Sequence, residues 1–349
     1  METEYPIEII ASHQSKTRVG ANISFLSIEK DIPQLNNLSE WFIYTGVKRM
    51  RRLTSSFLLW FLKKTTPDLH MDSTVRGLQR LVNLIDAGIP VFHDIYTDKE
   101  KEAEPDKAQT KLFYMPAVNG APFIVICAGG AYRSVYSMIE AFPAAEYINR
   151  LGYNAFILSY RIGGKRLLPK PVEDLAAALR CITKNAESFN VSPEKYGVAG
   201  FSAGGHLAAA WGTDNNGYIK YNQPKPAVLM LGYAPTDLAV FDKNPKSPVK
   251  KMLFKTMLGD NYAEKDIDAW NIVKNISNAY PPTYIWQCAD DKTVSTDSSV
   301  SMAEKLKELS VPHILRIFER GGHGIGVGEK TDASGWIKEA VAFWQENAG

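Results

Sequence analysis

The sequence predicts an α/β protein built on a mostly parallel, doubly wound sheet, and three observations carry this prediction. Short apolar runs alternate with helical segments from about residue 111 to the end of the chain. Some runs are apolar throughout, such as residues 123–127, which is typical of central parallel strands covered on both faces. A Gly-x-Ser-x-Gly pattern at residues 200–204 separates one such run from a helical segment. Together these features favour a parallel sheet with helices on both faces.

The alternating part of the chain, residues 106–349, is interpreted as the main domain. Its strands are expected at residues 111–115, 123–127, 154–158, 196–199, 227–232, 283–288 and 313–318. Its helices are expected at residues 137–150, 171–185, 207–211, 296–309 and 334–346. The second of these helices is well marked, because a proline stands at its start and Leu175, Leu179 and Ile182 are spaced for one buried face.

Residues 1–105 differ in pattern and are interpreted as a mainly helical N-terminal extension that forms part of the roof of the site. Weak alternation at 5–10 and 21–28 allows short strands, whereas residues 38–89 follow a mostly helical pattern. In that part, Trp41 and Tyr44 recur at helical spacing. Residues 97–109, rich in charged residues with one proline, are predicted as a turn or linker.

One segment interrupts the alternation in the main domain. About fifty residues separate the strand expected at 227–232 from the strand expected at 283–288, which is more than one crossover needs. Two helical stretches, near 252–258 and 263–272, lie within it. We therefore expect a cap-like insertion at about residues 240–280.

The composition excludes several classes of protein. The 349 residues are 45% hydrophobic and 22% charged, as in an ordinary soluble globular protein. A net charge of +2, without a nucleic-acid-binding motif, gives no reason to expect a nucleic-acid partner. The three cysteines lack metal-ligand spacing and fit a reducing compartment. The acidic start resembles no signal peptide and no apolar run is long enough to span a bilayer, so we expect a cytoplasmic protein.

Residues 48–64 combine six basic residues, four around Met50 at 48–52 and two at 63 and 64, with an apolar run between them, and they allow two interpretations. Such a basic amphipathic helix can lie on an anionic membrane surface. Alternatively, it packs on the main domain with its charges in solvent. The second interpretation is favoured, because charge runs are usually solvated faces.

The Gly-x-Ser-x-Gly pattern between a strand and a helix is the nucleophile elbow of α/β hydrolases. Ser202 stands at its centre and is the candidate nucleophile. The flanking glycines have a mechanical role, because side chains there would collide with the neighbouring strand and helix in so sharp a turn. The following helix begins beneath the serine.

An acid and a histidine are expected after the last two strands of this fold. The turn after residue 288 offers two acids, Asp290 and Asp291, and the glycine-rich loop after residue 318 contains His323. The order serine, acid, histidine is that of α/β hydrolases. A second histidine, His206, follows the serine by four residues and is expected to pack beneath the turn and bond a neighbouring loop.

The loop after residues 123–127 is the candidate oxyanion hole. Ala128-Gly129-Gly130-Ala131-Tyr132 stands there, and its small residues allow backbone N–H groups to approach a developing alkoxide. The expected donors are the amides of Gly130 or Ala131, together with that of Ala203 after the nucleophile. The alternative is a simple tight turn.

These motifs resemble the esterase/lipase group of α/β hydrolases that includes acetyl esterases and carbohydrate esterases, over about residues 110–347. The resemblance selects Asp291 as the acid, since Asp291-Lys292-Thr293-Val294 is similar to the group's Asp-x-x-Val turn. It also implies that Tyr132 lines the substrate pocket. Ala128 and Ala131 depart from the group's loop but keep their backbone donors. The resemblance implies a serine esterase for short acyl esters, with O-acetyl sugars as one class, and implies no metal or cofactor.

Two other classes of function stay open from the sequence. The same triad serves amidases, arylformamidases and peptidases, so ester and amide hydrolysis are not distinguished. A non-catalytic binding protein on this fold is a further alternative, which the complete set of triad candidates disfavours. The expected partner is a small ester, and the oligomeric state is not indicated.

Overall fold

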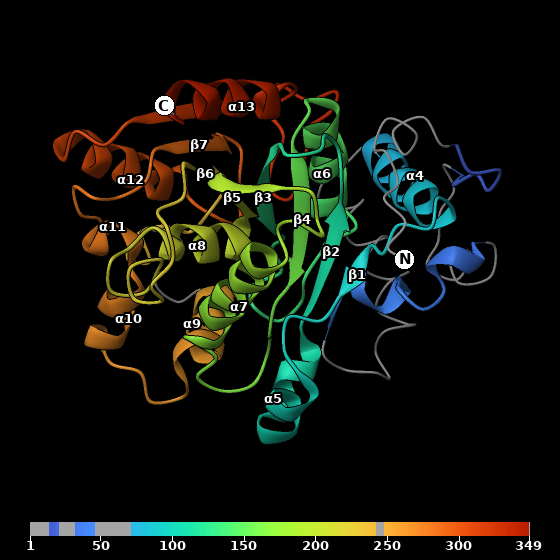
Figure 1. Cartoon of the computed structure of the whole chain (residues 1–349). Coiled ribbons are helices and arrows are strands. Elements are labelled where there is room, and N and C mark those ends of the chain that lie inside the picture. Colours follow the sequence, from blue (N-terminus) through green and yellow to red (C-terminus); the bar gives the residue numbers. More distant parts are fainter. Residues whose placement is uncertain (1–13, 21–31, 46–70, 242–247, 349) are drawn as a thin grey trace.

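The computed structural model describes residues 14–20, 32–45, 71–241 and 248–348, and its centre is a sheet (Figure 1). Within these residues the sheet has eight strands in the order β1-β2-β4-β3-β5-β6-β7-β8. The strands β3 to β8 are parallel to one another, whereas β2 pairs antiparallel with both β1 and β4. The strand bounds are β1 Phe92–His93, β2 Lys111–Met115, β3 Pro122–Cys127, β4 Asn154–Ser159, β5 Ser192–Phe201, β6 Val228–Gly232, β7 Thr283–Cys288 and β8 His313–Phe318.

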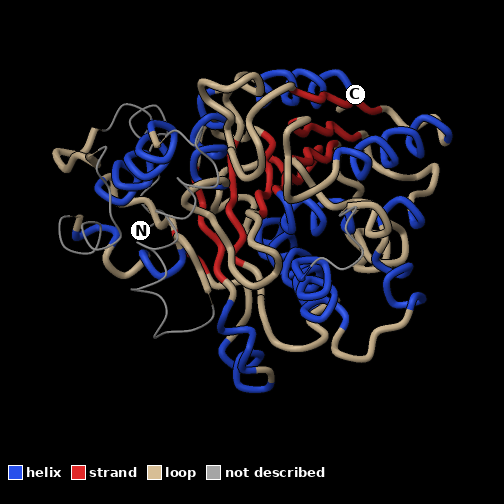
Figure 2. Tube along the Cα trace, turned by 180° about the vertical axis from the view of Figure 1, so that it is seen from behind, coloured by secondary structure: helices blue, strands red, loops and turns tan. Residues whose placement is uncertain are grey.

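Helices cover both faces of this sheet, as Figure 2 shows from behind. In Figure 1, α13 lies above β6 and β7, and α8 lies below them. Helix α13 also contacts α6, and α7 contacts α8. The helix bounds are η1 Pro33–Leu35, η2 Ser39–Trp41, α4 Asp72–Asp86, α5 Asp98–Ala103, η3 Pro105–Gln109, α6 Ala141–Arg150, α7 Lys170–Lys184, α8 Ser202–Trp211, α9 Pro248–Leu258, α10 Glu264–Trp270, α11 Ile272–Asn275, α12 Thr296–Glu308 and α13 Trp336–Asn347.

The mostly parallel α/β sheet predicted from the sequence is confirmed. Every residue of β4, β6 and β7 is buried, as expected for strands covered on both faces. The edge strand β8 has no fully buried residue. The predicted insertion contains α9, α10 and α11, close to the two helical stretches expected there.

Two expectations for the N-terminal part are wrong. The predicted linker at 97–109 contains α5 and η3, and Thr97 starts α5 with a capping box in which its side chain and that of Glu100 exchange hydrogen bonds with backbone amides. The helical spacing of Trp41 and Tyr44 does not produce one helix. Instead, η2 ends at Trp41, and Tyr44 forms an antiparallel β-bridge with Val135.

The described part of residues 1–105 packs against the sheet. Helix α4 contacts α6 closely, since a Cβ at Gly77 would lie 2.8 Å from the carbonyl carbon of Phe142. Phe42 and Leu81 are fully buried in the same hydrophobic core as the strands. The division of the chain at about residue 105 stays a prediction. The strands expected at 5–10 and 21–28 and the basic stretch at 48–64 lie outside the described residues.

No helix in the described part of the chain has both the length and the apolar character needed to cross a bilayer. The cytoplasmic location stays a prediction from the sequence.

Candidate active site

The Gly-x-Ser-x-Gly segment forms a sharp turn between β5 and α8. Strand β5 ends at Phe201, and Ser202 begins the helix with φ +50°, a left-handed conformation that is strained for a non-glycine residue. A Cβ at Gly200 would lie 2.1 Å from the carbonyl oxygen of Gly204, and a Cβ at Gly204 would lie 2.1 Å from that of Cys127. Both glycines are therefore required by backbone contacts.

The structure brings Ser202, His323 and Asp291 together from three separate loops. His323 Nε2 lies 2.9 Å from Ser202 Oγ, and His323 Nδ1 lies 2.8 Å from Asp291 Oδ2. The side chain of Asp291 is 0% exposed and that of His323 is 18% exposed. The three side chains form a continuous hydrogen-bonded line, with the histidine between the hydroxyl and the carboxylate.

The two neighbouring aspartates have different partners. The Oδ1 atom of Asp291 accepts hydrogen bonds from the amides of Thr293 and Val294, at 2.8 and 3.0 Å. The carboxylate of Asp290 instead accepts a hydrogen bond from the amide of Gly322, at 2.8 Å, in the loop that carries the histidine. Asp291 therefore contacts the imidazole itself, whereas Asp290 holds the loop around it.

The surroundings of His323 favour its protonated form. Burial alone lowers the pKa of His323, but attraction to Asp291, the hydrogen bond to Asp291 and the charge of Glu140 outweigh burial and raise this pKa above the ordinary 6.5. An imidazole with a raised pKa is a stronger base, and a base beside a serine hydroxyl can remove its proton.

The glycine-rich loop after β3 lies directly against the elbow. A Cβ at Gly129 would lie 2.9 Å from Ser202 Cβ. Gly130 and Ala131 have φ +136° and +53°, so the backbone turns sharply beside the serine. Among the described residues, the amides of Gly130 and Ala131 donate to no acceptor. The amide of Ala203 lies in the first turn of α8, where no helical carbonyl is available. These N–H groups are available to an oxyanion.

A buried carboxylate joins this loop to the histidine loop. Glu140 is 3% exposed, and its Oε2 accepts a hydrogen bond from the amide of Gly129. Its Oε1 accepts a hydrogen bond from the hydroxyl of Tyr233 at 2.8 Å, and that hydroxyl accepts one from the amide of Gly326 at 3.1 Å. The ring centroid of Tyr233 lies 4.8 Å from that of His323. The sequence analysis missed Glu140 and Tyr233, and no local pattern signals them.

Tyr132 and His206 connect the oxyanion loop to the insertion. Tyr132 is 1% exposed, and its hydroxyl lies 2.8 Å from His206 Nδ1. His206 Nε2 lies 2.9 Å from the carbonyl oxygen of Trp270, at the end of α10. Since a carbonyl only accepts, Nε2 carries the proton and the tyrosine donates to Nδ1. Burial lowers the pKa of His206 to about 4, which keeps this ring neutral. The predicted bond from His206 to a neighbouring loop is present, whereas lining of the pocket by Tyr132 stays a prediction.

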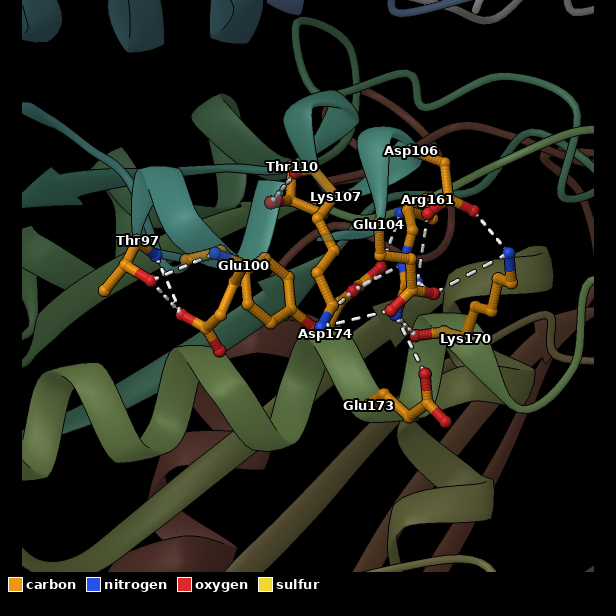
Figure 3. A network of polar contacts seen from close by, with 11 residues as sticks. Thr97, Glu100, Glu104, Asp106, Lys107, Thr110, Arg161, Lys170, Glu173 and Asp174 are labelled. Atoms are coloured by element: carbon orange, nitrogen blue, oxygen red, sulfur yellow. Dashed lines mark hydrogen bonds and ion pairs between the residues drawn. The ribbon is translucent and has the colours of Figure 1, made fainter. Parts of the chain in front are cut away.

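A network of charges surrounds Arg161, the residue after Tyr160. Figure 3 shows the side chain of Arg161 among four carboxylates, those of Glu104, Asp106, Glu173 and Asp174. Arg161 is 1% exposed, and its Nε donates to Asp174 at 2.8 Å.

Tyr160, the residue before Arg161, connects this charge network to the oxyanion loop. The hydroxyl of Tyr160 donates to the carbonyl oxygen of Ala128 at 2.6 Å. The N-terminal part contributes Glu104, so it takes part in holding the strand end beside the loop.

The described residues contain no group of three or more histidine, cysteine, aspartate or glutamate side chains arranged to hold a metal ion. The site as described consists of a hydroxyl, an imidazole, a carboxylate and backbone N–H groups.

Comparison with known proteins gives matches over this region. A family model described as BD-FAE matches residues 113–306. Endo-1,4-beta-xylanase B of Butyrivibrio fibrisolvens is 29% identical over 222 residues, which cover 61% of this chain and 34% of the relative. Acetylxylan esterase of Xylanibacter ruminicola is 26% identical over 252 residues, which cover 69% of this chain and 50% of the relative. An acetyl ester-xyloside bifunctional hydrolase from Caldicellulosiruptor lactoaceticus has a solved structure with TM-score 0.62 and 27% identity, covering 73% of this chain and 95% of that one.

These matches confirm the α/β-hydrolase fold and the resemblance to esterases that the motifs indicate. The chain spans between one third and one half of the length of these two curated relatives. The family match begins after β2 has started, so the helices α4 and α5 lie outside it.

Proposed function

Because the chain belongs to the BD-FAE family, a family of α/β-hydrolase esterases, we propose that it is a serine hydrolase that cleaves short-chain carboxylic esters. O-Acetyl esters of sugars are the leading substrate class, since two relatives are named for acetyl esters together with xylan or xyloside. The proposed triad is Ser202, His323 and Asp291.

In the first half of the reaction, Ser202 Oγ attacks the ester carbonyl carbon while His323 Nε2 accepts the hydroxyl proton. The carbonyl oxygen becomes an oxyanion, which the amides of Gly130 or Ala131 and of Ala203 stabilise by hydrogen bonds. The bond to the alcohol oxygen then breaks, and His323 gives its proton to the leaving alkoxide. The acyl group stays on Ser202 as an ester.

In the second half, a water molecule replaces the alcohol. His323 accepts a proton from the water, whose oxygen attacks the acyl carbon and forms a second oxyanion in the same position. When this intermediate collapses, the proton returns to Ser202 Oγ and the carboxylic acid leaves. Asp291 keeps the imidazole in the required tautomer and stabilises its charged form throughout.

One observation carries the proposal, namely the hydrogen-bonded line from Ser202 Oγ through both nitrogens of His323 to Asp291 Oδ2, at 2.9 and 2.8 Å. Both distances lie within the range needed for direct proton transfer and for orientation of the base. The unoccupied amides beside Ser202 supply the second requirement, which is stabilisation of the oxyanion.

Labelling with a fluorophosphonate probe tests the nucleophile. The native protein is expected to be labelled at Ser202, and Ser202→Ala is expected to show no labelling while keeping the native circular-dichroism spectrum. Absence of labelling in the folded native protein would contradict the proposal.

A matched pair of substrates tests the ester preference. The rates of 4-nitrophenyl acetate and 4-nitroacetanilide, which differ in the ester oxygen and amide nitrogen, are compared with native protein. We expect faster turnover of the ester, and release of acetate from acetylated xylo-oligosaccharides. A larger kcat/KM for the anilide would favour the amidase alternative.

A further inference from the structure

A basic pocket lies next to the oxyanion loop. Its volume is about 430 Å³, which is sufficient for a sugar-sized group. It is formed by the loop after β3, the segment after β4 and the helix α9 of the insertion. The lining residues are Arg133, Gly164, Lys165, Lys251, Met252, Lys255, Thr256 and Asp260.

Backbone hydrogen bonds fix this pocket relative to the reacting groups. The amide of Arg133 donates to the carbonyl oxygen of Gly130 at 2.9 Å, so this pocket residue is part of the turn in the oxyanion loop, called the oxyanion turn below. The amide of Gly163 donates to the carbonyl oxygen of Tyr132 at 2.8 Å. On the other side, the amide of Leu167 donates to the carbonyl oxygen of Thr256 in α9 at 3.0 Å.

The charges of the pocket are unbalanced. Four of its lining residues are cationic, and Asp260 is the single acid among them. Asp260 pairs with Lys165 at 2.8 Å and with Lys255 at 3.1 Å. Arg133 and Lys251 form no ion pair with any residue in the described ranges. Within the described residues, the pocket therefore presents two cations, Arg133 and Lys251, that no acidic side chain pairs with.

We propose that this pocket binds a carboxylate on the alcohol part of the ester, so that the enzyme prefers acidic esters such as acetylated sugars that carry a uronic acid. The inference rests on the proposed esterase function. In this arrangement the acyl group is held at Ser202 and the alcohol part of the ester lies on the Arg133 side of the loop that carries Gly130. Cations that line a site attract anionic substrates and help to position them.

The test compares esters that differ only in charge. Two pairs are used: 4-acetoxybenzoate with 4-acetoxybenzamide, and acetylated xylo-oligosaccharides with and without a glucuronate branch. For each pair the anionic-to-neutral ratio of kcat/KM is measured, and the aryl ratio is divided by the ratio of the hydroxide-catalysed rates. The ratio is independent of the amount of active enzyme.

We expect Arg133→Gln and Lys251→Gln each to lower the ratio about two- to fivefold, as for the loss of one exposed charge pair. The ratio of the native enzyme should also fall between 0.01 and 1 M salt, where the Debye length decreases from about 30 to about 3 Å. The matched control is Lys338→Gln, an exposed lysine on α13, which removes the same charge far from α9 in Figure 1 and should leave the ratio unchanged.

Unchanged ratios for both substrate pairs in Arg133→Gln and Lys251→Gln would overturn the inference, as would an equal decrease in Lys338→Gln. In those cases, turnover of the neutral esters and fluorophosphonate labelling would still support the esterase function. If the native protein neither reacts with the probe nor cleaves the neutral esters, the proposed function itself fails.

Discussion

The two halves of the site are held in place by different physical means. In the half that carries the nucleophile, close backbone contacts set the geometry, because added Cβ atoms at Gly200 and Gly204 would overlap carbonyl oxygens at 2.1 Å. On either side of His323, added Cβ atoms at Gly322 and Gly324 would meet nothing within 4 Å, although one at Gly326, farther along the loop, would lie 2.8 Å from the carbonyl oxygen of Ile139. There the geometry is set by hydrogen bonds to two aspartates.

The two means of support suit the different roles of the two halves: one holds groups in fixed positions, and the other carries the residue that transfers a proton. The oxyanion amides and Ser202 need fixed positions, and backbone contacts permit little adjustment. The imidazole must exchange a proton between oxygen atoms, and hydrogen-bond partners tune its basicity as well as its position. Substitutions in the nucleophile half should therefore mainly lower stability, whereas substitutions in the histidine half should mainly lower turnover.

The largest expected effect is on turnover in the histidine half. Asp291→Asn should lower kcat about 10⁴-fold, because an amide no longer stabilises the required tautomer of His323. Asp290→Asn is the matched control and should lower kcat less than about tenfold, since its remaining oxygen can accept the hydrogen bond from Gly322. Steady-state kinetics with 4-nitrophenyl acetate measures both. A greater loss in Asp290→Asn would reverse the assignment of the acid.

The next effect is on stability in the nucleophile half. Gly204→Ala should lower the free energy of unfolding by about 3 kcal/mol or more, because the new methyl group overlaps the carbonyl of Cys127. Gly322→Ala should cost only about 1–2 kcal/mol, since φ +69° is strained for alanine but the space is open. Urea denaturation measures the free energy of unfolding of both variants. Equal decreases in the two variants would refute the contrast between the halves.

A smaller effect on stability is expected at Glu140, which connects the oxyanion loop to the histidine loop. Glu140→Gln should lower the free energy of unfolding by about 1–3 kcal/mol, because the amide can accept from only one of the donors on Gly129 and Tyr233. Glu146→Gln, in the helix α6 that Glu140 precedes, is the control. Its carboxylate pairs with the half-exposed Arg150 at 2.9 Å and lies 3.8 Å from the guanidinium of Arg76, and loss of these partly exposed pairs should cost about 1 kcal/mol. Urea denaturation measures both variants. If Glu140→Gln leaves the free energy of unfolding unchanged, Glu140 does not stabilise the contact between the two loops.

The smallest and most gradual effect is that of pH. The pKa of His323 is raised above 6.5, so on acidification the imidazole becomes protonated, and stops acting as a base, at a pH above 6.5. The value of kcat/KM should therefore fall as the pH drops through the pKa of His323. Asp291→Asn removes the largest raising influence and should shift this decline to lower pH. His206, with a pKa of about 4, contributes nothing there. The pH profile of kcat/KM with a neutral ester measures the shift, and a decline that does not move would contradict it.

The sequence predicted the sheet and the positions of the candidate triad because both depend on local patterns. Apolar runs of β3, β4 and β7 identify buried strands directly, and the expected bounds differ from the observed ones by at most one residue. The loops at the ends of such strands converge by topology, so Ser202, Asp291 and His323 could be placed together without coordinates.

The parts that the sequence did not predict depend on distant partners. Glu140 lies one residue before α6, and nothing nearby distinguishes it from a solvated acid. Its role depends on Gly129, Tyr233 and Gly326, which only the tertiary structure brings together. By contrast, α5 could have been predicted, because Thr97 and Glu100 form a capping box that is visible in the sequence.

The bridge between Tyr44 and Val135 has a consequence for the order of events during translation. The amides of the two residues donate to each other's carbonyl oxygens at 3.0 and 2.8 Å, next to the oxyanion turn. Val135 is made about ninety residues after Tyr44, which corresponds to about 5–20 seconds of elongation. Phe42 packs on Phe113 and Phe142, with ring centroids 6.5 and 5.4 Å apart, so this early-made segment gains its core contacts only after these later residues are made.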